Sequence, residues 1–302
     1  GINNKQNQKV AVEMTKLSGV SHLRGVARHT SHSCAVLSDG GGRCWGKNDL
    51  GQVGRPPSNT APVTVIKGLG TGKLLDLVPG GTHTCALVVG GDVYCFGGND
   101  DGQLGYDGAG TFVPTKVTLP GPAKQVVLGQ SHTCALLVDG QVRCWGANLF
   151  GQLGNASNLA KSSPQPVQGL SDLPGSFKAT QLTAGTSHTC ALVANQGTSA
   201  LRCWGRGDDG QLGAAQVGNF NTPKKVENLP TTPVMVEAGK AHTCAVLDNE
   251  KSLCWGSNAG GQTIGSNQLT FSLQITAGTN HSCGLARDLV PRCFGTGAAG
   301  QL

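Results

Sequence analysis

The segment His132–Gly146, HTCALLVDGQVRCWG, places a histidine, two cysteines and a tryptophan within fifteen residues. Cysteine and histidine side chains held this close together can do three kinds of chemistry. They can bind a metal such as zinc, act as a redox-active thiol pair, or form a structural disulfide. The choice among these depends on how often the pattern occurs and on how the backbone positions it.

The pattern occurs six times along the chain. Each copy has a histidine, a cysteine two residues later, and a second cysteine directly before an aromatic residue and a glycine, and a version of Gly-Gln-Leu-Gly follows. The repeats, with that turn, occupy about residues 31–54, 82–105, 131–154, 187–213, 241–265 and 280–302. The first cysteines stand 51, 49, 56, 54 and 39 residues apart, and a period near fifty indicates a repeat architecture.

The repeat unit is typical of a β-propeller blade. Charged residues make up only 13% of the 302 residues and 47 are glycines, which favours short strands and tight turns over helices. Apolar residues alternate on both sides of the turn, and a later strand begins with Pro-x-x-Val, as at Pro114–Val117. One blade cannot bury both of its faces, whereas stacked blades can. We therefore predict an all-β propeller with six four-stranded blades.

The two cysteines of each repeat are expected to face each other across a hairpin. In the third repeat, a three-residue turn at Val138-Asp139-Gly140 places Cys134 opposite Cys144, and Gly140 supplies the left-handed backbone of such turns. Facing residues of an antiparallel pair lie within disulfide range. The predicted bonds, one per blade, are Cys34–Cys44, Cys85–Cys95, Cys134–Cys144, Cys190–Cys203, Cys244–Cys254 and Cys283–Cys293.

Zinc and free thiols are the alternatives for these cysteines. His132 and Cys134 share one face of a strand and Cys144 lies opposite, so three zinc ligands could converge. However, the usual Cys-x-x-Cys spacing is absent and no fourth ligand type recurs. Catalysis needs one special thiol rather than six equivalent pairs. The even count and the spacing favour disulfides, and we expect no metal, no cofactor and no catalytic residue.

A single domain is expected over residues 1–302. The last residues, Gly300–Leu302, would spell Gly-Gln-Leu-Gly if joined to Gly1. We expect the hairpins to be the inner part of each blade. Residues 1–30, with 10–28 as strands, would supply outer strands that close the ring with the last repeat. If the sequence is a window of a longer array, seven blades are the alternative. The short interval of 39 residues between the last two first cysteines is compatible with a six-blade ring and with a longer array.

Several residues of the repeat match a known family pattern: His132, the Asp139-Gly140 turn, Trp145-Gly146 and the Gly151–Gly154 turn. With these motifs in six copies, essentially the whole chain resembles the regulator of chromosome condensation family, which implies a β-propeller. Well-known members have seven blades, so six is a departure. Because the family carries the histidine without the cysteines, the resemblance implies a structural histidine. An aromatic residue that recurs at one register position indicates blade packing. The expected structural residues are His32, His83, His132, His188, His242, His281, Trp45, Phe96, Trp145, Trp204, Trp255 and Phe294.

The resemblance leaves the function open, because the family includes nucleotide-exchange factors, a plant ultraviolet-B photoreceptor and secreted bacterial inhibitors of β-lactamase. An exchange factor needs a partner-facing insertion, and the longest hairpin excursion, Ala194–Ala200, is only a few residues above the norm. The photoreceptor uses extra tryptophan clusters, whereas the four tryptophans here all belong to the repeat.

Six disulfides predict an oxidising compartment, and we expect a secreted or cell-surface protein. Asn155-Ala156-Ser157 is a candidate N-glycosylation sequon on an exposed loop. Asn280 begins a second, less favourable one that enters a hairpin strand and is expected to be too buried. Pro56-Pro57 could carry sugars on modified proline. The loops after Gly-Gln-Leu-Gly vary most and are the candidate contact surface. They are Arg55–Pro62, Tyr106–Val113, Asn155–Ser163 and Ala214–Thr222.

Other function classes find no support in the sequence. It has no Gly-x-Ser-x-Gly, His-Glu-x-x-His or phosphate-binding loop. The net charge of +6 forms no basic stripe for nucleic acid, and no apolar stretch reaches the length of a membrane span. We expect a non-enzymatic extracellular binding or structural module, such as a subunit of a surface filament, that contacts proteins or further copies through its ring-face loops. The alternatives are a secreted inhibitor or ligand-binding propeller, and a guanine-nucleotide exchange factor, which twelve paired cysteines disfavour.

Overall fold

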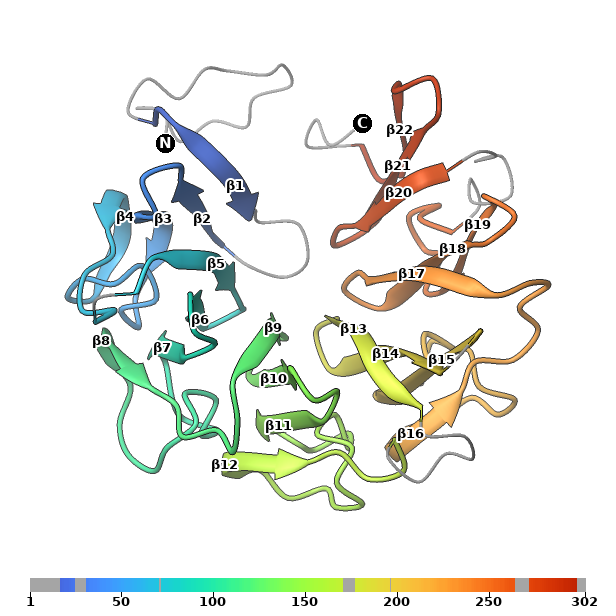
Figure 1. Cartoon of the computed structure of the whole chain (residues 1–302), viewed down its shortest axis with the longest axis horizontal. Coiled ribbons are helices and arrows are strands. Elements are labelled where there is room, and N and C mark those ends of the chain that lie inside the picture. The colour runs from blue at the N-terminus through green and yellow to red at the C-terminus, as the bar shows by residue number, and fades with distance from the viewer. Residues whose placement is uncertain are drawn as a thin grey trace.

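The structure, a computed structural model, describes residues 17–24, 31–70, 72–170, 177–195, 197–263 and 272–297. These residues form 22 strands and no helix, in six antiparallel sheets set around a central axis (Figure 1). The predicted all-β propeller with one blade per repeat is therefore confirmed. Within the described residues there is no helix that could cross a membrane.

The strands of the first three blades follow one another in chain order. Blade 1 contains β1 (Val20–Arg24), β2 (His32–Leu37), β3 (Gly42–Asn48) and β4 (Ser58–Val65). Blade 2 contains β5 (Leu74–Pro79), β6 (His83–Val88), β7 (Val93–Gly97) and β8 (Thr111–Lys116). Blade 3 contains β9 (Ala123–Leu128), β10 (His132–Leu137), β11 (Val142–Gly146) and β12 (Lys161–Pro166).

The remaining blades repeat this order with fewer described strands toward the end. Blade 4 contains β13 (Lys178–Ala184), β14 (His188–Asn195), β15 (Thr198–Gly205) and β16 (Phe220–Lys225). Blade 5 contains β17 (Pro233–Ala238), β18 (His242–Leu247) and β19 (Ser252–Gly256). Blade 6 contains β20 (Ser272–Ala277), β21 (His281–Ala286) and β22 (Pro291–Gly295). Three strands are described for each of blades 5 and 6, and the expected fourth strands lie outside the described residues.

The radial order of the strands corrects one expectation. Successive first strands, β1, β5, β9, β13, β17 and β20, contact one another, and Figure 1 shows them nearest the centre of the ring. The hairpins lie outside them, and fourth strands such as β8 and β12 form the rim. The described part of residues 1–30, β1, is thus an innermost strand rather than an outer one. The hairpin strands are the most apolar because a neighbouring blade covers each of their faces. The apolarity of a strand therefore does not indicate how far it lies from the axis.

The predicted closure of the ring lies largely outside the described residues, since it involves Gly300–Leu302 and much of 10–28. Among the residues that the structure describes, no sheet combines strands of blades 1 and 6. Blades 1 and 6, the first and last in chain order, stand at the upper left and the upper right of the view, each near one terminus (Figure 1).

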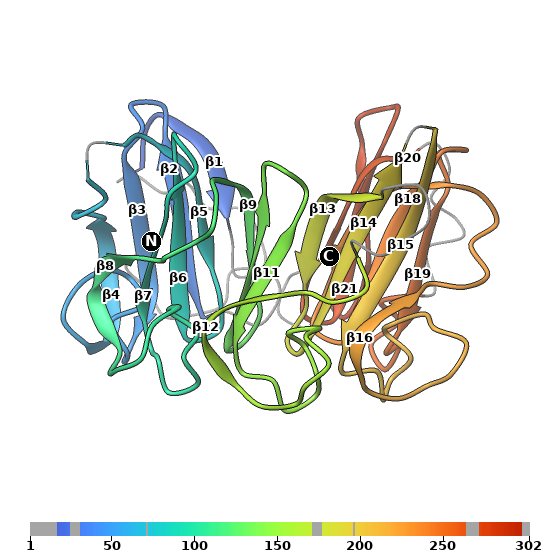
Figure 2. The ribbon, with the colours of Figure 1, turned by 60° about the horizontal axis from the view of Figure 1, so that its bottom comes forward.

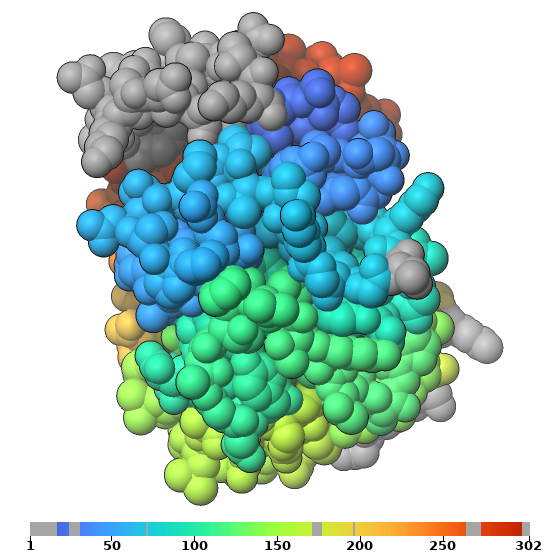
Figure 3. Space-filling view, turned by 90° about the vertical axis from the view of Figure 1, so that its left-hand side faces the viewer, coloured from blue at the N-terminus to red at the C-terminus, as the bar shows by residue number. Residues whose placement is uncertain are grey.

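The hydrophobic core of the molecule lies between blades. Cys134 and Leu136 of blade 3 pack in one cluster with Leu182 and Trp204 of blade 4. Four further clusters of the same composition join the other successive blades. The blades are accordingly continuous with one another at the surface, as the space-filling view of the first blades shows (Figure 3). Full burial of Trp204 contributes about 2–3 kcal/mol, so each interface holds a substantial share of the stability.

Candidate functional site

All twelve cysteines form disulfides within their own blades, with the six pairings that the hairpin geometry predicts. In blade 3, Cys134 pairs directly with Cys144 across β10 and β11, with their Cα atoms 4.1 Å apart. The hairpin turn has the expected geometry, because the amide of Leu137 donates to the carbonyl of Gln141 at 2.9 Å and Gly140 has a φ of +90°. The side chain of Asp139 accepts from the amide of Gln141 at 2.9 Å, as a turn-capping residue does.

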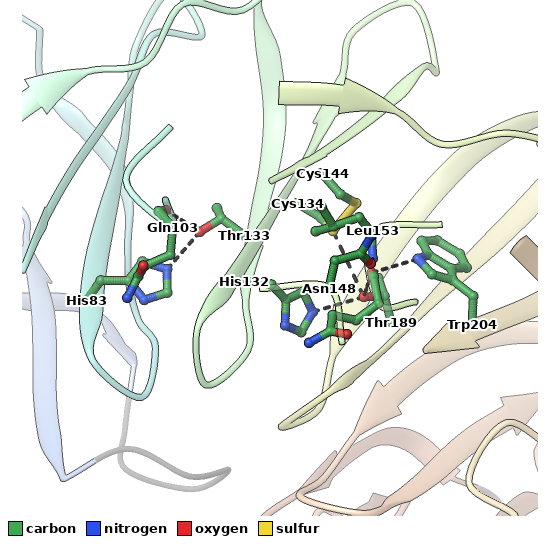
Figure 4. The surroundings of a disulfide bond; sticks show 11 residues. His83, Gln103, His132, Thr133, Cys134, Cys144, Asn148, Leu153, Thr189 and Trp204 are labelled. Carbon is green, nitrogen blue, oxygen red and sulfur yellow. Dashed lines mark hydrogen bonds between the residues drawn. A yellow bond between two sulfur atoms is a disulfide. The ribbon is translucent and has the colours of Figure 1, made fainter. Parts of the chain in front are cut away.

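The bridges of blades 1 to 5 also face the next blade. In blade 3, the sulfur of Cys134 lies 3.9 Å from the hydroxyl oxygen of Thr189 in blade 4 (Figure 4). Cys134 and Cys144 are both fully buried in the cluster shared by the two blades. The disulfide therefore links two strands of one blade while its sulfurs form part of an inter-blade surface.

A hydrogen-bonded chain crosses the same interface. The hydroxyl of Thr189 donates to the carbonyl of Gln152 at 3.1 Å, and Nε1 of Trp204 donates to that carbonyl at 2.9 Å. Nε2 of His132 lies 3.0 Å from the Thr189 hydroxyl (Figure 4). A hydroxyl carries one hydrogen, which Thr189 gives to the carbonyl, so His132 must donate from Nε2. The histidine is thus structural, as the resemblance implies, and its tautomer is fixed.

The chain of hydrogen bonds recurs at every described interface between successive blades. A histidine of one blade bonds the hydroxyl of the next, at 2.7–3.0 Å, and that hydroxyl donates to a glutamine carbonyl of the first blade. The other pairs are His32–Thr84, His83–Thr133, His188–Thr243 and His242–Ser282. These repeated hydrogen bonds fix the position of each blade relative to the next. We call the histidine, the hydroxyl and the glutamine carbonyl together the lock.

His242 of this lock is held neutral, and the pKa of His281 is shifted in the same direction. Burial, assisted by the nearby His281, lowers the pKa of His242 from 6.5 to about 4. Burial also lowers the pKa of His281. A neutral imidazole with its hydrogen on Nε2 is the form that the hydroxyl requires, so electrostatics and hydrogen bonding agree.

Five of the six repeat histidines follow a glycine by three residues, and His32, which follows His29, is the exception. A Cβ on Gly185 would lie 2.2 Å from Cε1 of His188 and 2.5 Å from the carbonyl oxygen of Gly239. The same holds at Gly129, where a Cβ would lie 2.1 Å from Cε1 of His132. Only glycine leaves room for the ring at these positions, which explains why glycine directly follows β9 and β13.

The Gly-Gln-Leu-Gly turn places the glutamine carbonyl in the lock. The side chain of Gln152 accepts from the amide of Phe150 at 3.0 Å, and Asn148 accepts from the amide of Leu153 at 3.0 Å. Leu153 is fully buried, which anchors the turn in the core. Gly154 has a φ of +66°, and a Cβ there would lie 2.8 Å from Nε1 of Trp204. The turn therefore forms part of the blade interface.

This arrangement removes the support for zinc at the repeated cysteines. Both sulfurs of each pair are in a disulfide, so the pair offers no thiolate to a metal. Nε2 of His132 is already committed to Thr189. In the residues that the structure describes, no group of three or more histidine, cysteine, aspartate or glutamate side chains could hold a metal ion.

The loops that follow the Gly-Gln-Leu-Gly turns lie at the opposite end of the sheets from the hairpin turns (Figure 2), and we call them the loop face. The loop face comprises residues 55–62, 106–113, 155–163 and 214–222 together with 149–150, which adjoin them. Leu149 and Leu159 are 74% and 70% exposed there, and Val217 is 72% exposed. Asn158 donates to the carbonyl of Leu149 at 3.1 Å, which brings the two leucines into one neighbourhood. Exposed apolar side chains that lie close together in this way are candidate contact residues for a partner.

The two sequons differ in their surroundings. Asn155 is half-buried, and its side-chain oxygen accepts from Asn148 at 3.2 Å and from the amide of Ser157 at 3.3 Å. The expectation that Asn280 is buried is wrong for that residue, which is exposed, although its partner Ser282 is fully buried in the lock. Attachment of a glycan at either residue stays a prediction.

The expected aromatic residues of blades 2 to 6 lie at blade interfaces, although with unequal burial. Phe96, Trp145 and Trp204 are fully buried, whereas Trp255 and Phe294 are half-buried. Trp45, in blade 1, is also half-buried.

The sequence interpretation did not identify the hydroxyl and the glutamine that the lock histidine requires. The signal was present, since every repeat histidine precedes a threonine or serine and every turn glutamine follows the second cysteine by eight residues.

Comparison with known proteins gives the same assignment. Two family models of the regulator of chromosome condensation (RCC1) repeat match the chain, one over residues 90–136, 139–192 and 203–246 and the other over 123–152, 179–211 and 236–262. The chain is 28% identical over 265 residues to the RCC1 domain-containing protein RUG3, mitochondrial, of Arabidopsis thaliana. That alignment covers 84% of this chain and 58% of the relative. The Ultraviolet-B receptor UVR8 of the same plant is 29% identical over 234 residues, which cover 76% of this chain and 40% of the receptor.

A solved structure supports the fold. Prp20p of Saccharomyces cerevisiae superposes with a TM-score of 0.71 and 21% identity, over 88% of this chain and 68% of that one. The chain spans about half the length of the curated relatives named above. Six repeats, their matching family models and the propeller ring together show that the chain belongs to the RCC1-repeat family of β-propellers.

Proposed function

We propose that this protein is a non-enzymatic, extracellular propeller that binds a protein partner through its loop face. The observation that carries the proposal is the exposed apolar pair Leu149 and Leu159, presented by loops on a disulfide-braced frame. RCC1-repeat propellers act in protein binding and regulation, and the family assignment supports the binding class.

The chemistry around the pair suits a protein partner. Aromatic residues and arginine are enriched at protein interfaces, and exposed leucines beside them supply apolar surface that a partner can bury. The guanidinium of Arg206 lies 5.4 Å from the centroid of the Phe150 ring, beside Leu149 in sequence. Partner contact would desolvate both leucines and strengthen this cation–π pair.

The loops of neighbouring blades are joined, so the loop face is preorganised. Ser162 donates a hydrogen bond to Asp107 of the preceding blade's loop. Asn221 donates to Asn158 at 2.9 Å, and the amide of Ala156 donates to the carbonyl of Asn221 at 2.9 Å. Loops held in place lose less conformational freedom on binding, which raises affinity without adding contacts.

The disulfides support an oxidising compartment, and from this we infer secretion or display on the cell surface. The relative RUG3 is named as mitochondrial, so family membership alone supplies no compartment. The inference therefore rests on the twelve paired cysteines of this chain. Glycans at Asn155, which lies on the loop face, and self-assembly into a filament are finer versions of the same proposal.

Capture from the extracellular fraction of the source organism tests the proposal. Three immobilised proteins are compared: the wild type, the double variant Leu149→Glu/Leu159→Glu, and the control Val138→Glu. Val138 is 61% exposed at the hairpin turn of the same blade, at the opposite end of the sheet. The expected result is a partner that the wild type and the control retain equally and that the double variant binds at least about tenfold more weakly. Equal retention by the double variant would overturn the proposal.

A guanine-nucleotide exchange activity is the alternative within the family. The structure of Prp20p was determined together with its binding to Gsp1p and histones, but 21% identity relates only the folds. A secreted inhibitor would be a narrower case of the proposed binding, because it would also use one ring face. The capture experiment identifies the partner and thereby separates these cases.

A further inference from the structure

The loop face carries one pair of residues per blade whose identity changes while its backbone position stays fixed. The pair directly precedes the first glycine of the Gly-Gln-Leu-Gly turn, and we call it the turn pair. In blades 1 to 5, the side chain of the turn glutamine accepts from the amide of the second residue of the pair, at 2.8–3.0 Å. The turn pairs are Asp49-Leu50, Asp100-Asp101, Leu149-Phe150, Asp208-Asp209 and Ala259-Gly260. The repeat thus presents variable side chains from a constant position.

The charge of the turn pair alternates over three successive blades. Blades 2 and 4 each present two carboxylates, whereas blade 3 presents the apolar pair Leu149-Phe150. Three of the four carboxylates are exposed, and that of Asp101 is half-buried. The loops of blades 2, 3 and 4 follow one another along the lower side of the view in Figure 2. The apolar turn pair therefore lies between two acidic ones.

The acidic turn pairs keep most of their negative charge. Asp208 pairs with Arg206 at 3.0 Å. No ion pair within the described residues involves the side chain of Asp100, Asp101 or Asp209. The loop face around the apolar turn pair is consequently negative, and a partner with positive charge can neutralise it.

The acidic turn pair of blade 2 lines a recess between two blades. The recess has a volume of about 340 Å³. Its walls include Asp100, Asp101, Tyr106 and Asp107 of blade 2 and Ala160 and Ser162 of blade 3. Ala160 directly follows Leu159, which is 70% exposed, so the recess adjoins the apolar surface of the loop face. A partner that covers Leu159 therefore reaches the acidic recess as well.

The recess suits a cationic side chain better than a metal ion. In the part of the chain that the structure describes, no group of three or more histidine, cysteine, aspartate or glutamate side chains could hold a metal ion. A lysine or arginine brings several N–H donors, so that separate carboxylates can each accept one of them. The ring of Tyr106 attracts a cation that lies over it. Lys161 does not fill the recess, because strand side chains alternate and its neighbour Ser162 is the one that lines the recess.

We propose that the partner of the loop face is a protein segment with an apolar side chain flanked on both sides by lysine or arginine. This inference rests on the proposed function, since it specifies the chemistry of the partner that the loop face binds. One cation enters the recess of blade 2, the apolar side chain covers Leu149 and Leu159, and the second cation bonds Asp209. The turn pairs thereby select the partner, because opposite charges across an interface favour the right partner and exclude like-charged ones.

An array of synthetic peptides tests the inference. Each peptide has a central Leu-Phe flanked by lysine and arginine at varied spacing, and a matching peptide has glutamate in place of each cation. The wild type is expected to bind the best basic peptide at least about tenfold more tightly than its glutamate counterpart. Asp100→Asn/Asp101→Asn keeps the shape of both side chains and removes their charge. This variant is expected to bind that peptide about tenfold more weakly, with a shallower dependence on salt.

Asp39→Asn/Asp139→Asn is the matched control, because it removes the same charge at the hairpin turns, at the opposite end of the sheets. Each of these carboxylates accepts from the amide two residues later, at 2.8 and 2.9 Å. Asparagine suits this position, since Asn249 accepts the equivalent bond in blade 5 at 3.2 Å. The control is expected to bind the basic peptide as tightly as the wild type does.

The inference is overturned if the wild type shows no preference for the basic peptides, or if the control weakens binding as much as Asp100→Asn/Asp101→Asn. The capture experiment separates this inference from the proposed function. If Leu149→Glu/Leu159→Glu loses the captured partner while Asp100→Asn/Asp101→Asn retains it fully, the loop face binds a partner without using its charge, and only the inference fails. If the double leucine variant retains the partner, the proposed function itself fails, whatever the peptides show.

Discussion

Replacement of Thr189 by valine tests the lock between blades most sharply. Valine has nearly the same shape, so the change removes the hydroxyl while keeping the volume. The hydroxyl accepts a hydrogen bond from His132 at 3.0 Å and donates one to the carbonyl of Gln152 at 3.1 Å. Thr189 and His132 are both fully buried. The carbonyl keeps its bond from Trp204, but the Nε2 hydrogen of His132 loses its acceptor.

The expected cost follows from the group left unpaired. A buried donor without an acceptor costs about 1–3 kcal/mol, and the lost bond to the carbonyl adds about 0.5–1 kcal/mol. We therefore expect Thr189→Val to lower the free energy of unfolding by about 2–3 kcal/mol. Serine should restore most of this, because Ser282 makes both bonds at the next-but-one interface, at 2.9 and 3.1 Å.

The assay is equilibrium unfolding in guanidinium chloride with the disulfides intact, followed by tryptophan fluorescence. The matched control is Thr64→Val on β4, whose hydroxyl is partly exposed and bonds only the nearby carbonyl of Pro62. This control is expected to change stability by less than about 0.5 kcal/mol. The reasoning is refuted if Thr189→Val is as mild as the control, or if Thr189→Ser is as damaging as valine.

Three further outcomes follow from the same structure. The pKa of His242 is about 4 in the folded state and 6.5 ordinarily, so the unfolded chain takes up the proton first and stability is lost as the pH falls from 6.5 to 4. The loss from this residue is about 2 kcal/mol by pH 5, and titration curves of wild type and His242→Gln that run parallel would contradict it. Gly185→Ala should cost more than about 3 kcal/mol, because its Cβ would lie 2.2 Å from the histidine ring three residues later. Gly121→Ala, with no atom within 4 Å, should be nearly neutral in the same melt. Replacing Cys134 and Cys144 by serine should cost about 2–3 kcal/mol, read from denaturant midpoints, and an unchanged midpoint would count against a bracing role.

The parts of the structure that the sequence predicts are local along the chain. The Cys134–Cys144 pair follows from a three-residue turn, because the turn fixes the register of both strands. The same argument gives all six bridges and, through their repetition, the propeller. No distant residue is needed for either conclusion.

The parts that the sequence left unpredicted depend on contacts between blades. His132 and Thr189 are 57 residues apart, and Thr189 and Gln152 are 37 apart, so no local pattern connects them. The prediction of where β1 lies relative to the axis was wrong for a related reason. The apolarity of a strand reflects how well neighbouring blades cover it, and it does not indicate which strand is nearest the axis. The apolar pair on the loop face, Leu149 and Leu159, lies in loops whose sequences do not repeat.

The central claim is a disulfide-braced binding propeller that matures in an oxidising compartment. It is tested most directly by counting thiols in protein purified from its natural source, with an alkylating agent present from lysis onward. After denaturation without reductant, none of the twelve cysteines should carry the label, and after reduction all twelve should. Twelve labelled cysteines before reduction would contradict the account.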